Sequence, residues 1–500
     1  MELGREGMYY KEFHACFDWF HHGEAWSTVF LQGLADPHDR ALTHRLRRWT
    51  SWYSGDDPYV PNYDRQHKII RSFFNGSRGP LLRKAIALDW AGDPIEVKGR
   101  FRAGHGEQSF DEMLDHFRDY TDVVGDNHVN LGATTLGLTT YALTGDARAR
   151  EWVLEYLDAW VERTQHNGGL IPSSVGPDGK IDSGYGWYGG VYGWGFSVLQ
   201  VPRNGALAHR AYHRRTPFAF ANGLLLSGDR RYVDLWRGVL DTVNGNARQE
   251  HGQTLYPQMY GRLDRLERLQ QGGEVHDLPQ QGPEGWYEFQ PQKFSWGAVP
   301  LYFWTHDRSA LDFLPEPPRW LRFLDGQDAG YPEAALAADL DALRLKLERT
   351  REDSRSPDMT MSDDMNRMNP ATINALTQLM LGGIPTGRDV HVLHCQLRYF
   401  DPQRRRAGLP EDVAALVDRI TENEVGVTLV NLSPLDARTV VVQGGAYAEH
   451  QVQRVRSESG ADTPVDHSHF VVHLAPGAGE RLTLTLRRYA NRPTLAQPWV

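Results

Sequence analysis

Hydrophobic and polar residues follow a repeated helical pattern along the first two thirds of the chain. Residues 133–143 are apolar or small almost throughout, which predicts a buried helix, and a second helix around Trp152 to Trp160 has one apolar and one charged face. Gly145 and Asp146 stand between them, as a glycine that ends one helix and an aspartate that caps the next. The same order returns from Phe218 to Leu240, and weaker copies cover 26–49 and 299–314.

Repeated pairs of a buried and a surface helix predict a mainly α fold, an (α/α) toroid of inner and outer helical hairpins. We assign residues 1–384 to this toroid as the catalytic domain. The alternative is an α-solenoid. The repeats are irregular and separated by long loops rich in Gly, Pro and aromatic residues, which favours an enzyme over a scaffold.

The pattern changes after about residue 385, where short β-branched stretches are separated by Gly, Pro, Asn and Asp. We therefore expect residues 385–500 to form a small antiparallel β-sandwich domain, interrupted by one helix over Glu411 to Ile420. Residues 348–358 are expected to be a loop before the last toroid helix, which begins near Pro370. The expected strands cover 390–400, 426–432, 439–442, 451–455, 470–474 and 481–486.

Composition narrows the classes of function. The 500-residue chain has 40% hydrophobic and 24% charged residues, as in ordinary globular proteins, and its net charge of -10 argues against nonspecific nucleic-acid binding. Cys16 and Cys395 are too few for a disulfide framework or a thiolate zinc site. No run of about 18 apolar residues predicts a membrane span. The N-terminus has no apolar signal region, so we expect a cytoplasmic protein, or a secreted or periplasmic one whose signal peptide has been removed.

Fifteen Trp and 21 Tyr are many for this length, and several stand between glycines in the loop Asn167 to Phe196. Glycine lets a backbone approach a ligand closely, and aromatic rings stack on the flat apolar faces of sugars. The alternative is a rigid loop packed by its own rings. We interpret the loop as a sugar-binding wall that contains Tyr185, Trp187, Tyr188, Tyr192 and Trp194.

A second group of polar residues precedes the buried helix at 133–143. Asp126, Asn127 and His128 place a carboxylate, an amide and an imidazole together where a helix N-terminus favours negative charge. The alternative is that Asp126 or Asn127 only caps the helix, which accounts for one of these residues but not for all three.

Other polar residues precede further predicted inner helices, and their shared position at one mouth of the toroid makes them candidates. A basic run contains His209, Arg210, His213, Arg214 and Arg215, and would suit an acidic sugar. The remaining candidates are Tyr59, Asn62, Tyr63, Asp64 and His67, which open an expected early helix, Trp286, Tyr287 and Glu288, and Asp363, Asp364 and Asn366.

The sequence implies no cofactor and no metal. His21 and His22 point in different directions on a helix, so that they do not converge on one ion with His14 and Glu24. Asp178 and Asp182 flank a predicted turn but offer too few ligands for calcium.

Helical hairpins, Asn127-His128 at an inner-helix start, tyrosine- and tryptophan-rich loops and a trailing β-domain resemble the (α/α)-toroid polysaccharide lyases of alginate, chondroitin and heparinase type. The resemblance implies that Asn127 neutralises a uronate carboxylate, that His128 removes the C5 proton, and that Tyr188 or Tyr192 protonates the leaving oxygen. The C-terminal β-region is much shorter than in the large chondroitin-type lyases.

These observations predict an enzyme that cleaves an acidic poly- or oligosaccharide, with β-elimination as the first hypothesis. A glycoside hydrolase of glucuronidase or unsaturated-uronide type is the alternative. It needs two carboxyl groups about 5–5.5 Å apart for retention or about 6.5–9.5 Å apart for inversion. Asp126, Glu288, Asp363 and Asp364 are the candidates. A carbohydrate-binding protein without catalysis is the third hypothesis.

Overall fold

The structure is a computed structural model that describes residues 26–57, 62–71, 126, 128–172, 175–181, 215–271, 283–355, 372–385 and 391–499. The chain divides into two compact units. The first unit comprises Met1–Phe30, His38–Pro315 and Gly387–His391, and the second comprises Leu31–Pro37, Glu316–Thr386 and Val392–Val500. The domain boundary at 384/385 stays a prediction.

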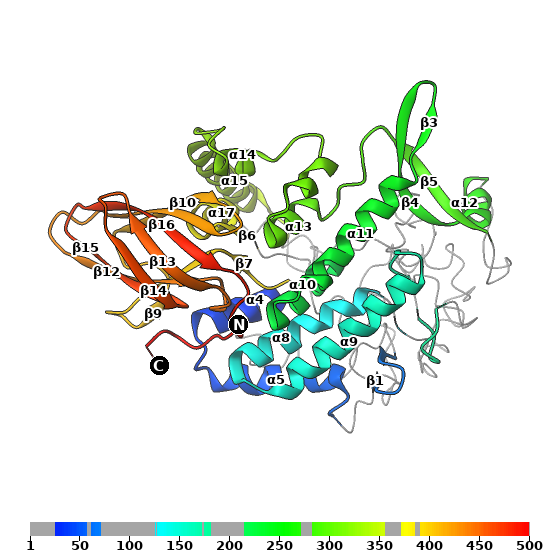
Figure 1. The fold of residues 1–500 in the computed structure, drawn as a ribbon, viewed down its shortest axis with the longest axis horizontal. Coiled ribbons are helices and arrows are strands. Elements are labelled where there is room, and N and C mark those ends of the chain that lie inside the picture. The colour runs from blue at the N-terminus through cyan, green and yellow to red at the C-terminus, as the bar shows by residue number, and fades with distance from the viewer. Residues whose placement is uncertain are drawn as a thin grey trace. The chain divides into compact units, whose positions relative to one another are not determined.

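Helical hairpins form in the first unit where the sequence pattern predicts them (Figure 1). The apolar helix α8 (Thr134–Thr144), preceded by the 3-10 helix η3 (His128–Ala133), pairs with the amphipathic α9 (Ala147–His166). In the same way α10 (Arg215–Ser227) pairs with α11 (Arg231–Gly245). The unit also contains α5 (Arg40–Ser54), α13 (Ala298–Thr305) and the 3-10 helix η4 (Arg308–Phe313), and α4 (Trp26–Ala35) begins in it.

The predicted helix ends are confirmed. Gly145 follows α8 with φ 71°, a left-handed conformation that favours glycine, and the side chain of Asp146 accepts a hydrogen bond from the Arg148 backbone N–H at 3.1 Å. Close contact joins each helical pair. A Cβ added to Gly137 would lie 2.4 Å from Val153, and one added to Gly223 would lie 2.6 Å from the Tyr232 ring. Larger residues at these two positions would push the helices apart.

The first unit also contains strands. The short pair β1 (Tyr63–Asp64) and β2 (Ile69–Ile70) replaces the early helix that the sequence predicts here. An antiparallel sheet of β3 (Arg248–Glu250), β4 (Gln253–Arg262) and β5 (Glu284–Gln290) follows α11, with α12 (Leu263–Gln270) between β4 and β5.

Besides Leu31–Pro37, the described residues of the second unit form the helices α14 (Arg319–Leu324), α15 (Tyr331–Glu352) and α17 (Asn374–Leu381), followed by strands. The strands β6 (Gly383–Ile384) and β7 (His394–Cys395) form a small pair. Nine further strands form two antiparallel sheets in the orders β10-β11-β16-β13-β14 and β15-β12-β8-β9. Their bounds are β8 (Leu397–Asp401), β9 (Arg406–Ala407), β10 (Val413–Ile420), β11 (Glu424–Asn431), β12 (Arg438–Gly444), β13 (Gln451–Ser457), β14 (Asp462–His467), β15 (His469–Leu474) and β16 (Gly479–Arg487).

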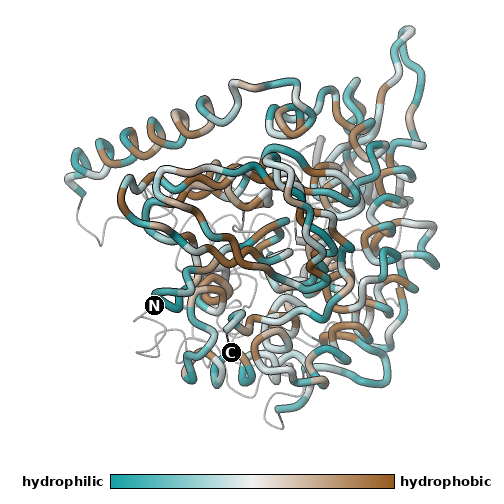
Figure 2. Tube along the Cα trace, turned by 60° about the vertical axis from the view of Figure 1, so that its left-hand side comes forward, coloured by the Kyte–Doolittle hydropathy of each residue, from teal (hydrophilic) through white to brown (hydrophobic). Residues whose placement is uncertain are grey.

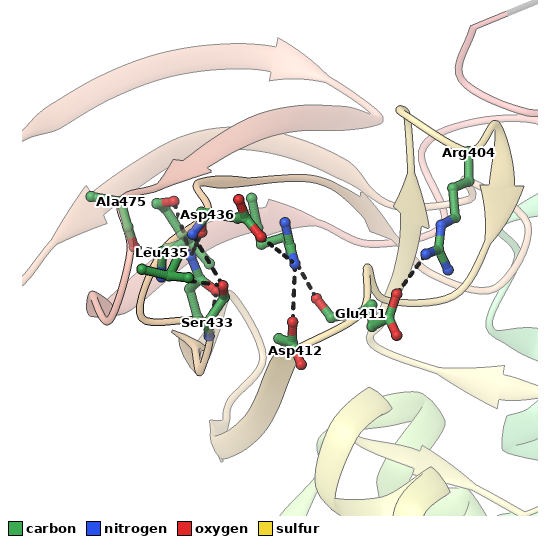
Figure 3. Close-up of polar contacts among 10 residues, drawn as sticks. Arg404, Glu411, Asp412, Ser433, Leu435, Asp436 and Ala475 are labelled. Carbon is green, nitrogen blue, oxygen red and sulfur yellow. Dashed lines mark hydrogen bonds and ion pairs between the residues drawn. The ribbon is translucent and has the colours of Figure 1, made fainter.

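Polar side chains fix the turn between β11 and β12 (Figure 3). Asn431 donates from Nδ2 to the carbonyl oxygens of Asp436 at 2.8 Å and Ala475 at 3.0 Å, which ties the turn to the end of β15. Arg438 lies 2.9 Å from the Asp412 carboxylate and 3.6 Å from that of Asp436. The bonds from Asn431 satisfy backbone carbonyl groups that the turn leaves outside the sheet ladder.

The predicted fold class is wrong. The described residues are 41% helix and about 26% strand in five small sheets, so that the protein is a mixed α and β structure with a sheet-rich C-terminal region and not a mainly α toroid. The helical hairpins are real, but segments taken for loops or helices pair as strands. Residues 413–420, expected as a helix, form β10 against β11, and residues 286–288, expected before an inner helix, lie in β5. Of the expected loop at 348–358, residues 348–352 form the last turn of the helix α15.

Candidate functional site

Asp126 lies in a short β-bridge with Val175, immediately before η3, and joins several parts of the first unit. Its backbone N–H donates to the Val175 carbonyl at 2.7 Å and its carbonyl accepts from the Val175 N–H at 2.7 Å. Its carboxylate accepts hydrogen bonds from the Ile70 backbone N–H at 3.0 Å, Asn130 Nδ2 at 2.7 Å and the Tyr156 hydroxyl at 2.9 Å. One side chain therefore connects β2, the bridge, η3 and α9.

The Asp126 side chain is 1% exposed. Desolvation raises the pKa of this carboxyl group to about 6, while the bonds from Asn130, Ile70 and Tyr156 and the charge of Arg163 act in the opposite direction. The effect of burial on the pKa of Asp126 is therefore larger than the combined opposite effect of the three hydrogen bonds and the nearby cation. A group so enclosed is suited to holding the chain in place and is out of reach of a polymeric substrate.

Aromatic rings pack beside this carboxylate. The rings of Trp152 and Tyr156 stack with their centroids 6.2 Å apart, and Tyr63 lies edge-on to both. The Tyr63 hydroxyl donates to Glu155 Oε1 at 2.9 Å, and burial raises the pKa of the Tyr63 phenol well above its usual range. The structure thus places Tyr63, a predicted substrate-binding residue, in a buried cluster with a satisfied hydroxyl group.

His128, the predicted base, lies in η3 with 0% of its surface exposed. The structure brings it together with Asp126 at one helix start, as the sequence predicts. Their roles stay predictions. The remaining candidates of the expected centre and of the sugar-binding wall lie outside the described residues: Asn127, Tyr185, Trp187, Tyr188, Tyr192, Trp194, His209, His213 and Arg214.

The hairpin of β4 and β5 presents a different environment. Register pairs Tyr256 with Gln290 and Tyr260 with Trp286, while Met259 pairs with Tyr287. Met259 and Tyr287 are 4% and 8% exposed and form the buried side. Because side chains alternate along a strand, the other side carries aromatic rings and polar groups. This side, here the hairpin face, consists of Tyr256, Gln258, Tyr260, Trp286, Glu288 and Gln290.

Contacts made by these side chains support their assignment to one face of the hairpin. The Tyr260 and Trp286 rings lie with centroids 4.8 Å apart and planes at 64°. Gln258 donates from Nε2 to the Gln292 carbonyl at 3.0 Å. All six residues of the hairpin face are partly or fully exposed. The hairpin face is therefore an accessible surface of two tyrosines, a tryptophan, two amides and one carboxyl group.

Glu288 is the predicted catalytic candidate on this face. Its side chain is exposed, and within the described part of the chain no hydrogen bond or ion pair holds its carboxyl group. Neighbouring atoms withdraw part of its hydration, and this desolvation raises the pKa of Glu288 above its usual range. Its backbone φ of 54° is left-handed, a conformation that costs a side-chain-bearing residue about 1–3 kcal/mol.

Sequence reasoning found Glu288 but missed Tyr256, Gln258, Tyr260 and Gln290. The signal was present in the alternation of aromatic and other residues over 253–262 and 284–290. Pro257 obscured it, because proline within a run argues against a strand.

A family model described as a domain of unknown function (DUF8034) matches residues 2–314 and 315–377. The chain belongs to this family. Neither a curated protein nor a solved structure matches it.

In this DUF8034 protein, no group of three or more His, Cys, Asp or Glu among the described residues is arranged to hold a metal ion. The carboxylate of Asp178 lies 4.0 Å from Lys180 Nζ. Asp182 and the group His14, His21, His22 and Glu24 lie outside the described residues. No helix in the described ranges is long and apolar enough to cross a membrane.

Proposed function

We propose that this protein is a carbohydrate-active enzyme that cleaves a poly- or oligosaccharide, and that the hairpin face contacts the sugar. The observation that supports this most directly is the pairing of Tyr260 and Trp286 beside an exposed Glu288 whose carboxyl group has no partner in the described part of the chain. We further propose that the sugar contains uronic acid, because the basic run His209 to Arg215 in the sequence would suit a negatively charged sugar.

The hairpin face suits a sugar for physical reasons. A pyranose ring has flat C–H faces that stack on aromatic rings, and its rim of hydroxyl groups needs donors and acceptors in the same plane. Tyr256, Tyr260 and Trp286 supply rings, and Gln258 and Gln290 supply amides that both donate and accept. A few polar groups among aromatic ones are typical of small-molecule sites.

Glu288 is suited to be a general acid. A general acid must carry a proton to donate to the oxygen of a glycosidic bond, and a pKa raised by desolvation favours the protonated form of Glu288. We therefore favour hydrolysis over elimination for this hairpin. A second carboxylate is needed across the bond. Asp126 is too buried for that role, and Asp363 and Asp364 lie outside the described residues.

β-Elimination remains the second candidate because of the bonds around Asp126. They hold Asp126 and Asn130, which stand on either side of His128 in the sequence, and this is how an enzyme would keep an imidazole in position. The full burial of His128 argues against direct contact with a polymer.

The first test is to incubate the purified full chain with saturated and unsaturated uronic-acid polysaccharides and oligosaccharides, together with neutral glycans. Reducing ends and the ultraviolet absorbance of a conjugated uronate are both measured. Hydrolysis predicts new reducing ends without new absorbance, or loss of absorbance from an unsaturated substrate. New absorbance together with new reducing ends would mean elimination. No product from any glycan would contradict the proposal.

The matched variants are Glu288→Gln and Glu250→Gln. Glu250 lies on the adjacent β3 and pairs with Arg248 at 2.9 Å, an exposed contact worth little. Loss of a general acid lowers turnover by about 100- to 10,000-fold, so Glu288→Gln should do so while Glu250→Gln stays near the native rate. Equal rates in both variants would remove Glu288 from the reaction.

A further inference from the structure

Exposed apolar residues gather on two helices of the second unit. Leu336 and Leu340 on α15 are 40% and 53% exposed, and Ile373 and Leu376 at the start of α17 are 44% and 45% exposed. Single exposed apolar residues need no explanation, but a group of them on adjacent elements is typical of an interaction surface. No residue of α15 is buried over its 22 positions.

The leucines of α15 follow the spacing of a coiled coil. Leu336, Leu340, Leu343 and Leu347 are separated by four, three and four residues, which places them along one stripe of the helix. In Figure 2 the long helix at the upper left changes between apolar (brown) and polar (teal) residues within each turn. A stripe of this kind packs against a second stripe of the same kind.

The helix α17 supports α15 at its flank. Asp339 accepts from the Thr372 hydroxyl at 3.1 Å and from the Ala375 backbone N–H at 3.1 Å, and the Tyr331 hydroxyl donates to Gln378. These bonds hold α15 in position and leave its leucines partly exposed.

Charge is segregated along α15. Residues 331–341 contain Glu333, Asp339 and Asp341 and no Lys or Arg, whereas residues 342–352 contain four basic and two acidic residues. A parallel pair would set like ends together. An antiparallel pair sets the acidic half of one helix against the basic half of the other, which electrostatic complementarity favours.

We propose that α15 is a self-association surface, on which two copies of this chain pair their α15 helices antiparallel about a two-fold axis. In the register that superposes the leucines, Leu336 of each copy packs against Leu347 of the other, and Leu340 packs against Leu343. Such an interface is isologous, because each contact occurs twice. This inference does not depend on the proposed function.

The test measures the mass of the full chain by sedimentation over a range of concentrations. The native chain should dimerise, and Leu340→Asp should be monomeric at concentrations where the native chain is a dimer. Leu432→Asp is the control, because Leu432 is an exposed leucine of the same unit, at 65%, away from α15. Both variants should keep the native far-ultraviolet circular dichroism, which shows that each chain is folded. A monomeric native chain, or a Leu340→Asp dimer, would overturn the proposal.

Cysteine crosslinking tests the antiparallel direction. Leu336→Cys and Leu347→Cys chains, mixed and oxidised, should form a disulfide-linked heterodimer, because position 336 of one copy faces position 347 of the other. Each variant oxidised alone should give no more crosslinked dimer than the native chain, whose Cys16 and Cys395 set the background. A Leu336→Cys homodimer, or a mixture that crosslinks no better than either variant alone, would exclude antiparallel pairing.

Discussion

Asp126 and Glu288 are two carboxyl groups of the same unit whose pKa is raised by desolvation, and they differ in almost everything else. Asp126 is 1% exposed and accepts hydrogen bonds from Ile70, Asn130 and Tyr156. Glu288 is exposed on a strand, has a strained backbone, and in the described residues nothing binds its carboxyl group.

The difference shows that a raised pKa does not by itself indicate catalysis. In Asp126 the pKa follows from complete burial, and the hydrogen bonds commit the oxygens to holding four segments together. In Glu288 the shift is a consequence of partial desolvation on an aromatic surface, and the oxygens remain available. Accessibility and uncommitted oxygens separate the chemical candidate from the structural one.

The largest expected difference between them is in stability. Asp126→Ala leaves three buried donors without their acceptor, at about 1–3 kcal/mol each, so the free energy of unfolding should fall by about 3–9 kcal/mol. Glu288→Ala should change it by less than about 0.5 kcal/mol, as is usual at exposed positions. Chemical denaturation of both variants checks this. Similar losses in the two variants would mean that the distinction between them is wrong.

The second difference concerns pH. The pKa of Asp126 is about 6 in the folded protein, above its ordinary value of 3.8, so the folded state holds the proton more tightly than the unfolded state. This contribution to stability is complete below about pH 4 and is lost as pH rises to about 6. A shift of about two units corresponds to about 3 kcal/mol.

Asp126→Asn should remove this slope between pH 4 and 6. Burial also raises the pKa of Glu449 in the second unit, to about 7, and this adds a slope of the same sign, so the native chain and the variant must be compared directly. Parallel curves for the two proteins would mean that Asp126 titrates normally.

The sequence predicted local features of the fold better than its class. Gly145 ends α8 and Asp146 caps α9 as the sequence predicts, because both features depend only on residues that are close in the chain. Residues 413–420, rich in Ala and Leu, suit a helix, but their pairing with β11 makes them a strand. The β14 residues are mostly exposed and polar, so no hydrophobic pattern marks them as a strand.

The candidate site shows the same limit. The sequence placed Asp126 beside His128, but its bonds to Ile70 and Tyr156 span 56 and 30 residues and leave no local pattern. Likewise, the sequence groups Glu288 with its chain neighbours Trp286 and Tyr287, whereas the tyrosines across the hairpin follow from strand register.

The smallest expected effect separates binding from packing on the hairpin face. Aromatic contacts contribute about 0.5–1.5 kcal/mol beyond the area they bury, so Trp286→Ala should weaken binding of an oligosaccharide about fivefold with little change in melting temperature. Trp296→Ala is the control, because Trp296 is also exposed, at 36%, but lies outside β4 and β5. Calorimetric titration of both variants compares them. If both lose the same affinity, the rings of the hairpin face do not select the sugar. If Trp286→Ala unfolds early with native affinity, then that ring packs the hairpin, and Glu288 stands beside a structural tryptophan.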